Sequence, residues 1–484
     1  MPARETCASL TEKSTMPRER MGYRMCGQTF PTPRRDTEFS GDILPSDGAE
    51  VYLRTDLALA PIRAYIWKNI EGAKENEFGK VIIAREFASG TEMTVSPGET
   101  LVVDFGQNCA GVPSFVFKAA EGTVLTCLPA ELLNDGNGAK IRGMDGPEGS
   151  CHRENLRIPH TGIRLDYTFA AGDNYVTYYP HCTFFGYRYV SITATGNVSI
   201  KSLKSIPVTS ITKKMETGTI TTGNDLVNKL ISNTYWGQLS NYLSIPTDCP
   251  QRDERLGWTA DTQVFAETGT FFANTMKFFH KWMRDMRDTQ NSLGGFPRSG
   301  SPWHNTVMRK LRLGLGPMPG IIVPWTVWKQ FGDTQIIEES WNAMDLFMNH
   351  INDTKYNHET LCGENGNYQW ADWLSYEPLE SCSGLAFSPQ GPLPDAVSYW
   401  NYLSASYWVI DAFMMRDMAA ATGRDAAKYQ QMADSAKAYI KENFLNEDGT
   451  SNRHPQHYAN SCLVRLEKPA FGRRTQSEDD RPPA

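Results

Sequence analysis

The chain has 484 residues, of which 40% are hydrophobic and 21% charged. This is the composition of a globular protein, and it is too much chain for one core, so we expect two or three domains. The net charge of −7 excludes a basic face for nucleic acid. No run of about 18 apolar residues indicates a membrane span, and the first thirty residues show no signal sequence, so we expect a cytoplasmic location.

The cysteines give no sign of a metal site or a disulfide framework. There are ten of them, without a CxxC pair or a regular spacing. We therefore expect reduced, mostly buried thiols, no bound metal and no cofactor. Nothing in the sequence indicates an oligomeric state.

The first half of the chain has the pattern of antiparallel strands. From about Val51 to Thr209, short alternating or β-branched runs are separated by Gly, Pro and Asn or Asp. The clearest are LVVDFG, SFVFKAA, TVLTCL, YVTYYP and YRYVSITATG. We predict a β-sandwich accessory domain over residues 51–212. Residues 1–50, rich in Arg and Pro, have no periodicity and are predicted to be irregular.

After Thr222 the pattern becomes helical, with Asn224 or Asp225 as the first N-cap. Consecutive helices joined by long loops predict helical hairpins over residues 213–452, with the loops gathered at one end. Periodicity alone fits a toroid of hairpins and an ordinary bundle equally well. Further helices are expected over Thr259–Thr289, Val323–Gln330, Thr334–Asn352, Ser398–Ala421 and Ala426–Phe444.

The segment from Ile245 to Gln263, IPTDCPQRDERLGWTADTQ, concentrates charge between two helical stretches. Its carboxylates and guanidiniums would each need a partner if they were buried. A solvated loop is one interpretation, but Pro246 and Pro250 stiffen the backbone, and Trp258 lies among the charges. Rigid carboxylates beside an aromatic ring suit the cleavage of a sugar acetal. The charged residues are Asp248, Arg252, Asp253, Glu254, Arg255 and Asp261.

The stretch TDCPQRDERLGWTADTQ resembles the signature of the bacterial α-L-rhamnosidase family. The resemblance extends, in the family's order, to DFGQN (104–108), AELLNDG (130–136), FFGYRYV (184–190), IVPWTVWKQFGD (322–333) and ADWL (371–374). It implies a multidomain protein with an antiparallel β-sandwich followed by an all-α (α/α)6 toroid. It also implies an inverting glycoside hydrolase that removes terminal α-L-rhamnose from rhamnose-containing glycosides or oligosaccharides.

The resemblance assigns roles to individual residues. Glu254, the second acidic residue of the DER triplet, matches the family's general acid. A general acid must keep its proton near neutral pH, and the charges of neighbouring carboxylates would raise its pKa. Asp248, Arg252, Trp258 and Asp261 match positions that contact the sugar, and Asp372 and Trp373 of ADWL would form another wall of the pocket.

The second carboxylate of an inverting pair is not found in its expected context. Inversion places the acid and the base roughly 6.5–9.5 Å apart, with water between them. In the family the base is a Glu on a late loop of the barrel. Glu364, Glu377 and Glu380 are candidates on exposed loops, but none has the matching surroundings. We therefore expect the toroid to be incomplete and the base to be absent.

Two other interpretations remain. One is a different enzyme on the same toroid, such as another glycosidase, a lyase or a phosphorylase. A lyase would favour a Tyr/His or Tyr/Arg arrangement, and a phosphorylase would favour a phosphate-binding cluster of His, Ser and Lys. The segment supplies neither. A catalytically impaired fragment that only binds carbohydrate would keep the sugar-holding residues without a base.

The tail 453–484 shows neither helical periodicity nor a cap, and residues 308–320 lack the Trp-Gly-Asp-Ala motif that the family has before IVPW. Codons can be chosen for His454 to Lys468 such that, when they are read from the second nucleotide, they encode an apolar, helix-compatible sequence. We predict a frame change near Arg453, and a compensated pair of insertions and deletions around 308–320. The nucleotide sequence tests this prediction, because codons that do not permit the second frame would refute it.

Overall fold

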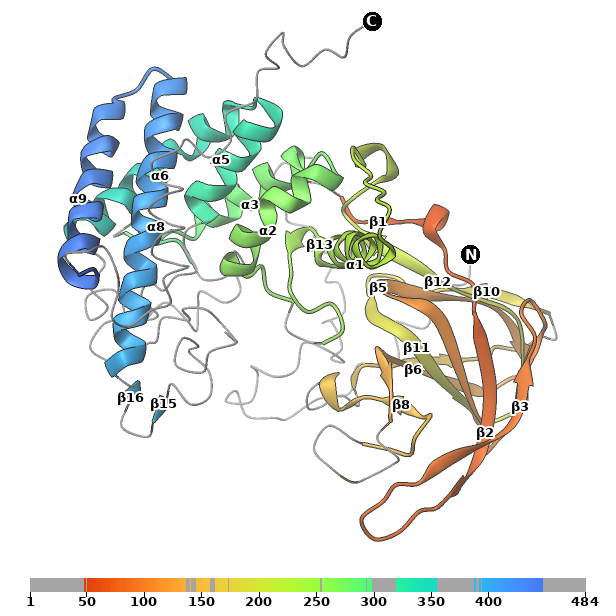
Figure 1. Cartoon of the computed structure of the whole chain (residues 1–484). Coiled ribbons are helices and arrows are strands. Elements are labelled where there is room, and N and C mark those ends of the chain that lie inside the picture. Colours follow the sequence, from red (N-terminus) through yellow and green to blue (C-terminus); the bar gives the residue numbers. More distant parts are fainter. Residues whose placement is uncertain are drawn as a thin grey trace, which may run out of the picture. The chain divides into compact units, whose positions relative to one another are not determined.

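The computed structural model describes residues 48, 50–135, 140, 145–156, 162–172, 174–252, 255–292, 294–297, 319–354, 387–388, 391–392 and 394–446. The chain divides into two compact units, Met1–Arg255 and Leu256–Ala484. The first unit contains the strands of a large antiparallel sheet, and the second is built of helices (Figure 1). The predicted order, a sheet domain followed by a helical domain, is confirmed.

The sheet of the first unit joins ten strands, and each pairing between them is antiparallel. A separate pair, β7 (Leu132–Leu133) and β8 (Cys151–His152), lies beside it. The ten strands are β1 (Tyr52–Leu53), β2 (Arg63–Glu71), β3 (Lys80–Phe87), β4 (Met93–Val95), β5 (Thr100–Ala119), β6 (Val124–Ala130), β9 (Leu165–Thr168), β10 (Val176–Tyr178), β11 (Phe185–Ala194) and β12 (Val198–Thr209).

Strand β5 belongs to both layers of this sheet. Residues 101–104 lie between β2 and β11, whereas residues 111–119 pair with β12 and, in part, with β10. The change of partners coincides with Gly106, whose φ is +76°, and with a register shift of β11 between Tyr187 and Tyr189. The sequence suggested two strands, LVVDFG and SFVFKAA, because the turn-forming residues between them look like a break. The structure joins them into one strand.

The main core lies between the two layers. Leu101, Val103 and Phe105 from the first part of β5 meet Phe115 and Phe117 from its second part in one buried cluster. The alternate residue Val102 faces the other side, where it packs with Tyr65 and Val81. This alternation follows from the two-residue period of a strand.

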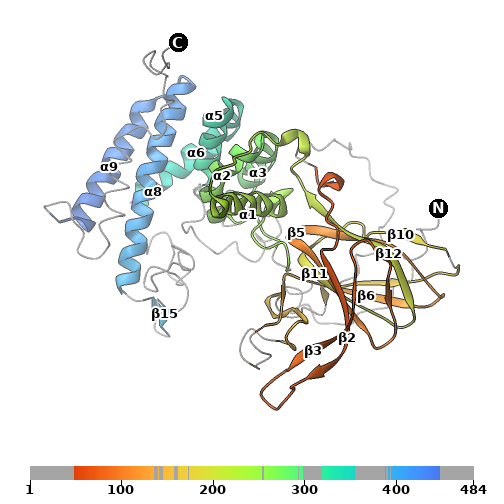
Figure 2. The same cartoon turned by 45° about the vertical axis from the view of Figure 1, so that its right-hand side comes forward.

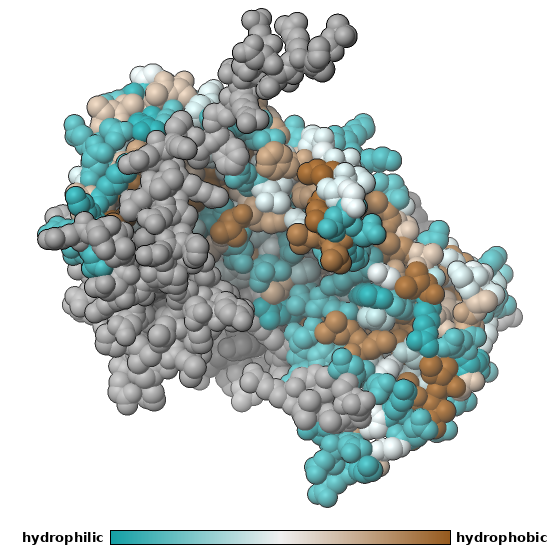
Figure 3. Space-filling model, viewed as in Figure 1, coloured by the Kyte–Doolittle hydropathy of each residue, from teal (hydrophilic) through white to brown (hydrophobic). Residues whose placement is uncertain are grey.

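Helix α1 (Asp225–Asn241) closes the first unit. The side chain of Asn224 accepts hydrogen bonds from the backbone N–H groups of Leu226 and Val227, so Asn224 is the N-cap. Near the other end, Leu239 is buried, and the Ser240 hydroxyl accepts a hydrogen bond from the Ala110 backbone N–H of β5. The helix also exposes apolar side chains: Leu226 is 82% exposed and Leu230 64%. Figure 3 shows brown, hydrophobic surface in the region where Figure 1 draws α1.

The described helices of the second unit differ in how much of their surface is buried. Helix α5 is buried all round from Pro319 to Val327, which is typical of an inner helix. Helix α3 buries one face, including Phe278, Trp282 and Met286, and is therefore an outer helix. Six described helices follow one another along this unit (Figure 2), and α5 packs against α6 and α8 against α9. Their bounds are α2 (Thr259–Phe272), α3 (Met276–Asp288), α5 (Pro319–Phe331), α6 (Gln335–Thr354), α8 (Pro394–Ala421) and α9 (Ala426–Phe444).

The predicted helix over Thr259–Thr289 is two helices. Helix α2 ends at Phe272, and Asn274 accepts a hydrogen bond from the Met276 backbone N–H at 3.2 Å, which begins α3. The other predicted helices are present, with ends that differ by a few residues.

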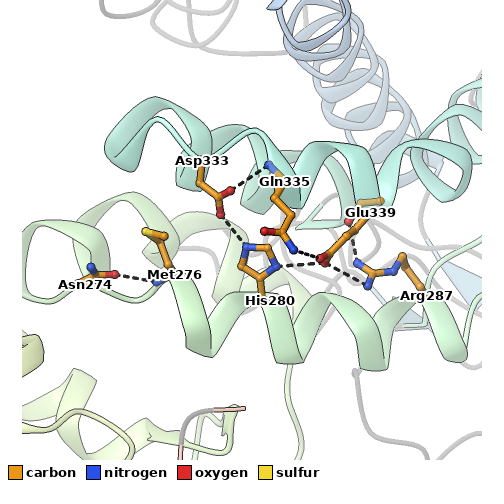
Figure 4. A network of polar contacts seen from close by, with 8 residues as sticks. Asn274, Met276, His280, Arg287, Asp333, Gln335 and Glu339 are labelled. Atoms are coloured by element: carbon orange, nitrogen blue, oxygen red, sulfur yellow. Dashed lines mark hydrogen bonds and ion pairs between the residues drawn. The ribbon is translucent and has the colours of Figure 1, made fainter. Parts of the chain in front are cut away.

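Polar contacts tie the outer helices α3 and α6 together (Figure 4). His280 of α3 lies 2.6 Å from Asp333 through Nε2 and 3.1 Å from Glu339 through Nδ1. Both ring nitrogens can donate only when the imidazole carries two protons. Arg287 lies about two helical turns after His280 on α3. It donates a hydrogen bond to the Ser340 hydroxyl, and its guanidinium lies 3.6 Å from the Glu339 carboxylate. The pairing of one hairpin with the next is therefore fixed by charge as well as by apolar packing.

A second set of contacts joins α6 to the last hairpin. Asp345 of α6 accepts hydrogen bonds from Lys428 and Tyr429 of α9. Arg424, which precedes α9, pairs with Glu338 at the start of α6. The repeated pattern supports a regular succession of hairpins.

The thiols within the described part of the chain are free, as expected. Cys109, Cys127 and Cys249 are buried, Cys151 is partly buried and Cys182 is exposed. Burial raises the pKa of the Cys109 thiol to about 11. No described helix is long and apolar enough to cross a membrane.

One buried carboxyl of helix α8 has no hydrogen-bond partner among the residues that the structure describes. Asp411 is fully buried, and neither of its oxygens is bonded. Burial raises the pKa of this carboxyl well above its usual range. At pH values between the unfolded and the folded pKa of Asp411, the folded protein therefore holds a proton that the unfolded chain releases.

We predict that Asp411→Asn changes the pH dependence of stability. Because the pKa of Asp411 is raised in the folded state, its contribution is present below the unfolded pKa and is lost as pH rises through the folded pKa. The Asn variant lacks this loss. Between the unfolded and the folded pKa, its free energy of unfolding therefore rises relative to that of the original chain by about 1.4 kcal/mol per pH unit. Urea unfolding from pH 4 to pH 8 measures it. Asp417→Asn, which removes the partner of Arg416 from the same helix, is the control. A difference that does not change with pH would contradict the prediction.

Candidate functional site

The charged segment Ile245–Gln263 runs from the first compact unit into the second. Asp248 and Arg252 belong to the first unit, and Trp258 and Asp261 belong to the second. The other predicted residues, namely Asp253, Glu254, Asp372, Trp373, Glu364, Glu377 and Glu380, lie outside the described residues.

The segment is fixed to the sheet unit at its start. The strands β13 (Tyr242–Leu243) and β14 (Ile245–Pro246) form a tight hairpin, in which Ser244 has a φ of +67°. The Ser244 backbone N–H donates to the Ser210 hydroxyl at 2.9 Å, and the Thr247 N–H donates to the Asn241 carbonyl at 2.8 Å. Asp248 follows, with an exposed side chain that accepts a hydrogen bond from the Cys249 thiol at 3.0 Å.

A partly buried carboxyl group of the sheet domain, Glu131, interacts electrostatically with Arg252. The side chain of Glu131 accepts hydrogen bonds from Asn108 at 2.9 Å and from Asn155 at 2.8 Å. Burial raises the pKa of Glu131, and the two hydrogen bonds and the positive charge of Arg252 oppose that rise. The Glu131 side chain, between β6 and β7, is thus held by two amide groups and interacts electrostatically with Arg252.

Sequence reasoning missed Glu131. It lies in AELLNDG, and Asn108 lies in DFGQN, two motifs that supported the resemblance but received no role. Their convergence on Arg252 depends on which strands pair, so the motifs were the only signal in the sequence.

The motif FFGYRYV has a structural part and a part that contacts the charged segment. Arg188 donates two hydrogen bonds to Asp104 of DFGQN, each at 2.8 Å. Such bidentate pairs combine charge with fixed geometry. Gly186 packs against the backbone of Pro250 and Gln251.

Arg255 folds back on the same segment. Its backbone has a φ of +50°, which is uncommon for a residue with a side chain. Its Nε donates to the Arg252 carbonyl at 2.8 Å, and its Nη2 donates to the Phe184 carbonyl at 3.3 Å. Its Cζ lies 3.8 Å from the centre of the Phe184 ring.

In the second unit, the predicted residues lie at the N-terminus of α2. Trp258 is the N-cap residue and is half-buried, and its carbonyl accepts hydrogen bonds from the N–H and the hydroxyl of Thr262. Asp261 lies in the first turn with its side chain exposed. A carboxylate there is stabilised by the helix dipole. Within the part of the chain that the structure describes, no group of three or more His, Cys, Asp or Glu could hold a metal ion.

Comparison with known proteins gives consistent matches. Residues 215–466 match the model of the bacterial alpha-L-rhamnosidase 6 hairpin glycosidase domain, and residues 77–210 match that of the bacterial alpha-L-rhamnosidase concanavalin-like domain. An alpha-L-rhamnosidase of Streptomyces avermitilis is 29% identical over 77% of this chain and 32% of its own length. One from Formosa agariphila is 32% identical over 58% of this chain and 28% of its own length.

A solved structure shows the same fold. The crystal structure of Streptomyces avermitilis alpha-L-rhamnosidase complexed with L-rhamnose matches with a TM-score of 0.63 and 24% sequence identity. The match covers 88% of this chain and 34% of that one. The chain thus spans about one third of the length of these relatives.

We predict that Glu131→Gln destabilises the sheet unit. The amide has one acceptor oxygen where the carboxyl group has two, so an amide donor of Asn108 or Asn155 loses its partner. The expected cost is about 1–3 kcal/mol, measured by urea unfolding at pH 4, where the raised pKa of Glu131 does not yet lower the stability of the original chain. Glu121→Gln, at an exposed position of the same unit, is the control and should stay within about 0.5 kcal/mol. Equal stability of the two variants would contradict the prediction.

Proposed function

Because the chain belongs to the bacterial α-L-rhamnosidase family, we propose that it takes part in the hydrolysis of terminal, non-reducing α-L-rhamnose with inversion of configuration. The observation that carries this proposal is the match to the six-hairpin glycosidase domain, which includes the segment with the paired carboxylates and Trp258. The substrates are rhamnose-containing glycosides or oligosaccharides.

In this proposal Glu254 is the general acid. Its carboxyl protonates the glycosidic oxygen as the bond to the anomeric carbon breaks, so the leaving group departs as a neutral alcohol. The acidic neighbours Asp248, Asp253 and Asp261 keep it protonated, because ionising one more carboxyl among them is unfavourable.

The sugar is held by groups around the acid. Asp248 and Asp261 accept hydrogen bonds from ring hydroxyls, and Arg252 donates to them. Trp258 offers a flat apolar face to the sugar ring, and Asp372 and Trp373 form a further wall. Within their own units, Asp248 and Asp261 have exposed side chains and Trp258 is half-buried, so each side chain is accessible to a ligand.

The carboxylate that activates water is not assigned to any residue of this chain. An inverting enzyme needs it roughly 6.5–9.5 Å from the acid. A second function, binding of rhamnose without turnover, is favoured by this gap.

We predict that this chain binds L-rhamnose, and that a version with the alternative frame after Arg453 also releases 4-nitrophenol from its α-L-rhamnopyranoside. In that version Glu254→Gln lowers the turnover of a rhamnoside with a poor alcohol leaving group by about 10²–10⁴-fold, and it leaves rhamnose binding nearly intact. Glu267→Gln, at an exposed position of α2, is the matched control.

Calorimetric titration with L-rhamnose and initial rates on both substrates separate the two functions. Binding without turnover by either version supports the carbohydrate-binding function. Neither binding nor turnover rejects both, and turnover that survives in Glu254→Gln removes Glu254 as the acid.

A further inference from the structure

The short segment Arg252–Arg255 carries the DER triplet and is fastened to the sheet domain by groups that the chemistry does not use. Arg255 closes it on itself, because its Nε donates to the Arg252 carbonyl across the two residues between them. The same guanidinium lies on the Phe184 ring at 3.8 Å and donates to the Phe184 carbonyl. One side chain therefore joins both ends of the segment to the start of β11.

The backbone conformation of Arg255 indicates that the contacts of its side chain are favourable. A left-handed conformation is unfavourable for a residue with a side chain. Such conformations persist when the surrounding contacts fix them, and they gather at functional sites. Here the Arg255 guanidinium is fixed by stacking on Phe184 and by two hydrogen bonds, and the left-handed backbone of Arg255 accompanies these contacts.

Phe184 is itself held firmly. Its ring is partly buried and packs on a cluster formed by Ala110, Val112, Ile206, Val208 and Leu243. This cluster joins β5, β12 and β13, so the ring moves only if the sheet moves.

Gly186 fastens the other side of the segment. A Cβ at this position would lie 2.6 Å from the Gln251 nitrogen, 2.7 Å from its Cα and 2.8 Å from the Pro250 carbonyl carbon. All three atoms are backbone, so any side chain at position 186 displaces the segment instead of rotating away. The FFG sequence is thus a contact surface for the chain that leads to Glu254.

We propose that the start of β11 is a positioning clamp for the general acid. In this clamp Gly186 contacts Pro250 and Gln251, Phe184 contacts Arg255, and Arg255 bonds to Arg252, so the described residues on both sides of Glu254 in the sequence are held. The clamp rests on the proposed function only for its effect on turnover. Arg255, Phe184 and Gly186 are positioning residues, and they do not touch the sugar.

The first test measures the clamp without any catalysis. Hydrogen exchange of the peptide covering residues 247–256 is followed in the full chain and in Gly186→Ala, Arg255→Lys and Phe184→Leu. Lysine keeps the charge but loses the planar fork and most of the stacking. We expect faster exchange in this peptide in all three variants, with the rest of the sheet unit unchanged. Gly196→Ala, whose Cβ would meet the Thr123 side chain just beyond the far end of β11, is the control.

The second test uses the version that turns over rhamnosides. A displaced acid slows departure of a poor leaving group more than departure of an activated one, because 4-nitrophenol needs little protonation. We expect kcat on an alkyl rhamnoside to fall by about ten- to hundredfold in Arg255→Lys and Gly186→Ala. The kcat on the 4-nitrophenyl substrate should fall much less, and KM should stay similar.

The outcomes separate the two ideas. Unchanged exchange of residues 247–256 overturns the clamp, whatever the turnover. Equal losses of kcat on both substrates overturn the positioning role, because a purely structural defect would not distinguish leaving groups. No turnover by the unsubstituted version rejects the proposed function, and the exchange measurement still decides the clamp. If Gly186→Ala does not fold, Arg255→Lys and Phe184→Leu carry both tests.

Discussion

The pairing of β11 with β5 is the constraint on which the rest of the first unit depends. Arg188 and Asp104 fix it with two charged hydrogen bonds, where β5 passes from one layer of the sheet to the other. A slip of one residue would turn Gly186 away from Gln251 and put a bulky neighbour there. The register of two strands therefore decides where the charged segment lies.

Local signals were enough for part of the fold. Asn224 was predicted as an N-cap because its amide oxygen can satisfy free backbone N–H groups, and it does so. The continuity of β5 was not predictable, because its halves are joined by partners far away in sequence. The break between α2 and α3 was missed, because apolar periodicity continues across Asn274.

The candidate site shows the same division. Clustered charge and family resemblance named Asp248, Arg252, Trp258 and Asp261, which the structure describes, and Glu254, which lies outside the described residues. The roles of all five stay predictions. Glu131 and the conformation of Arg255 could not be predicted, because one depends on strand pairing and the other on contacts with Phe184. Residues that only support a site leave a faint trace in sequence, because their identity is dictated by neighbours in space.

The apolar stripe on α1 has a consequence for how the polypeptide behaves in solution. Leu226 and Leu230 offer adjoining hydrocarbon surface that no part of the described chain covers. The net charge of −7 opposes self-association, but added salt screens that repulsion and leaves hydrophobic attraction in place. Self-association should therefore increase as ionic strength rises, whereas association through surface ion pairs would weaken. A preparation of this chain is best kept dilute and at low salt.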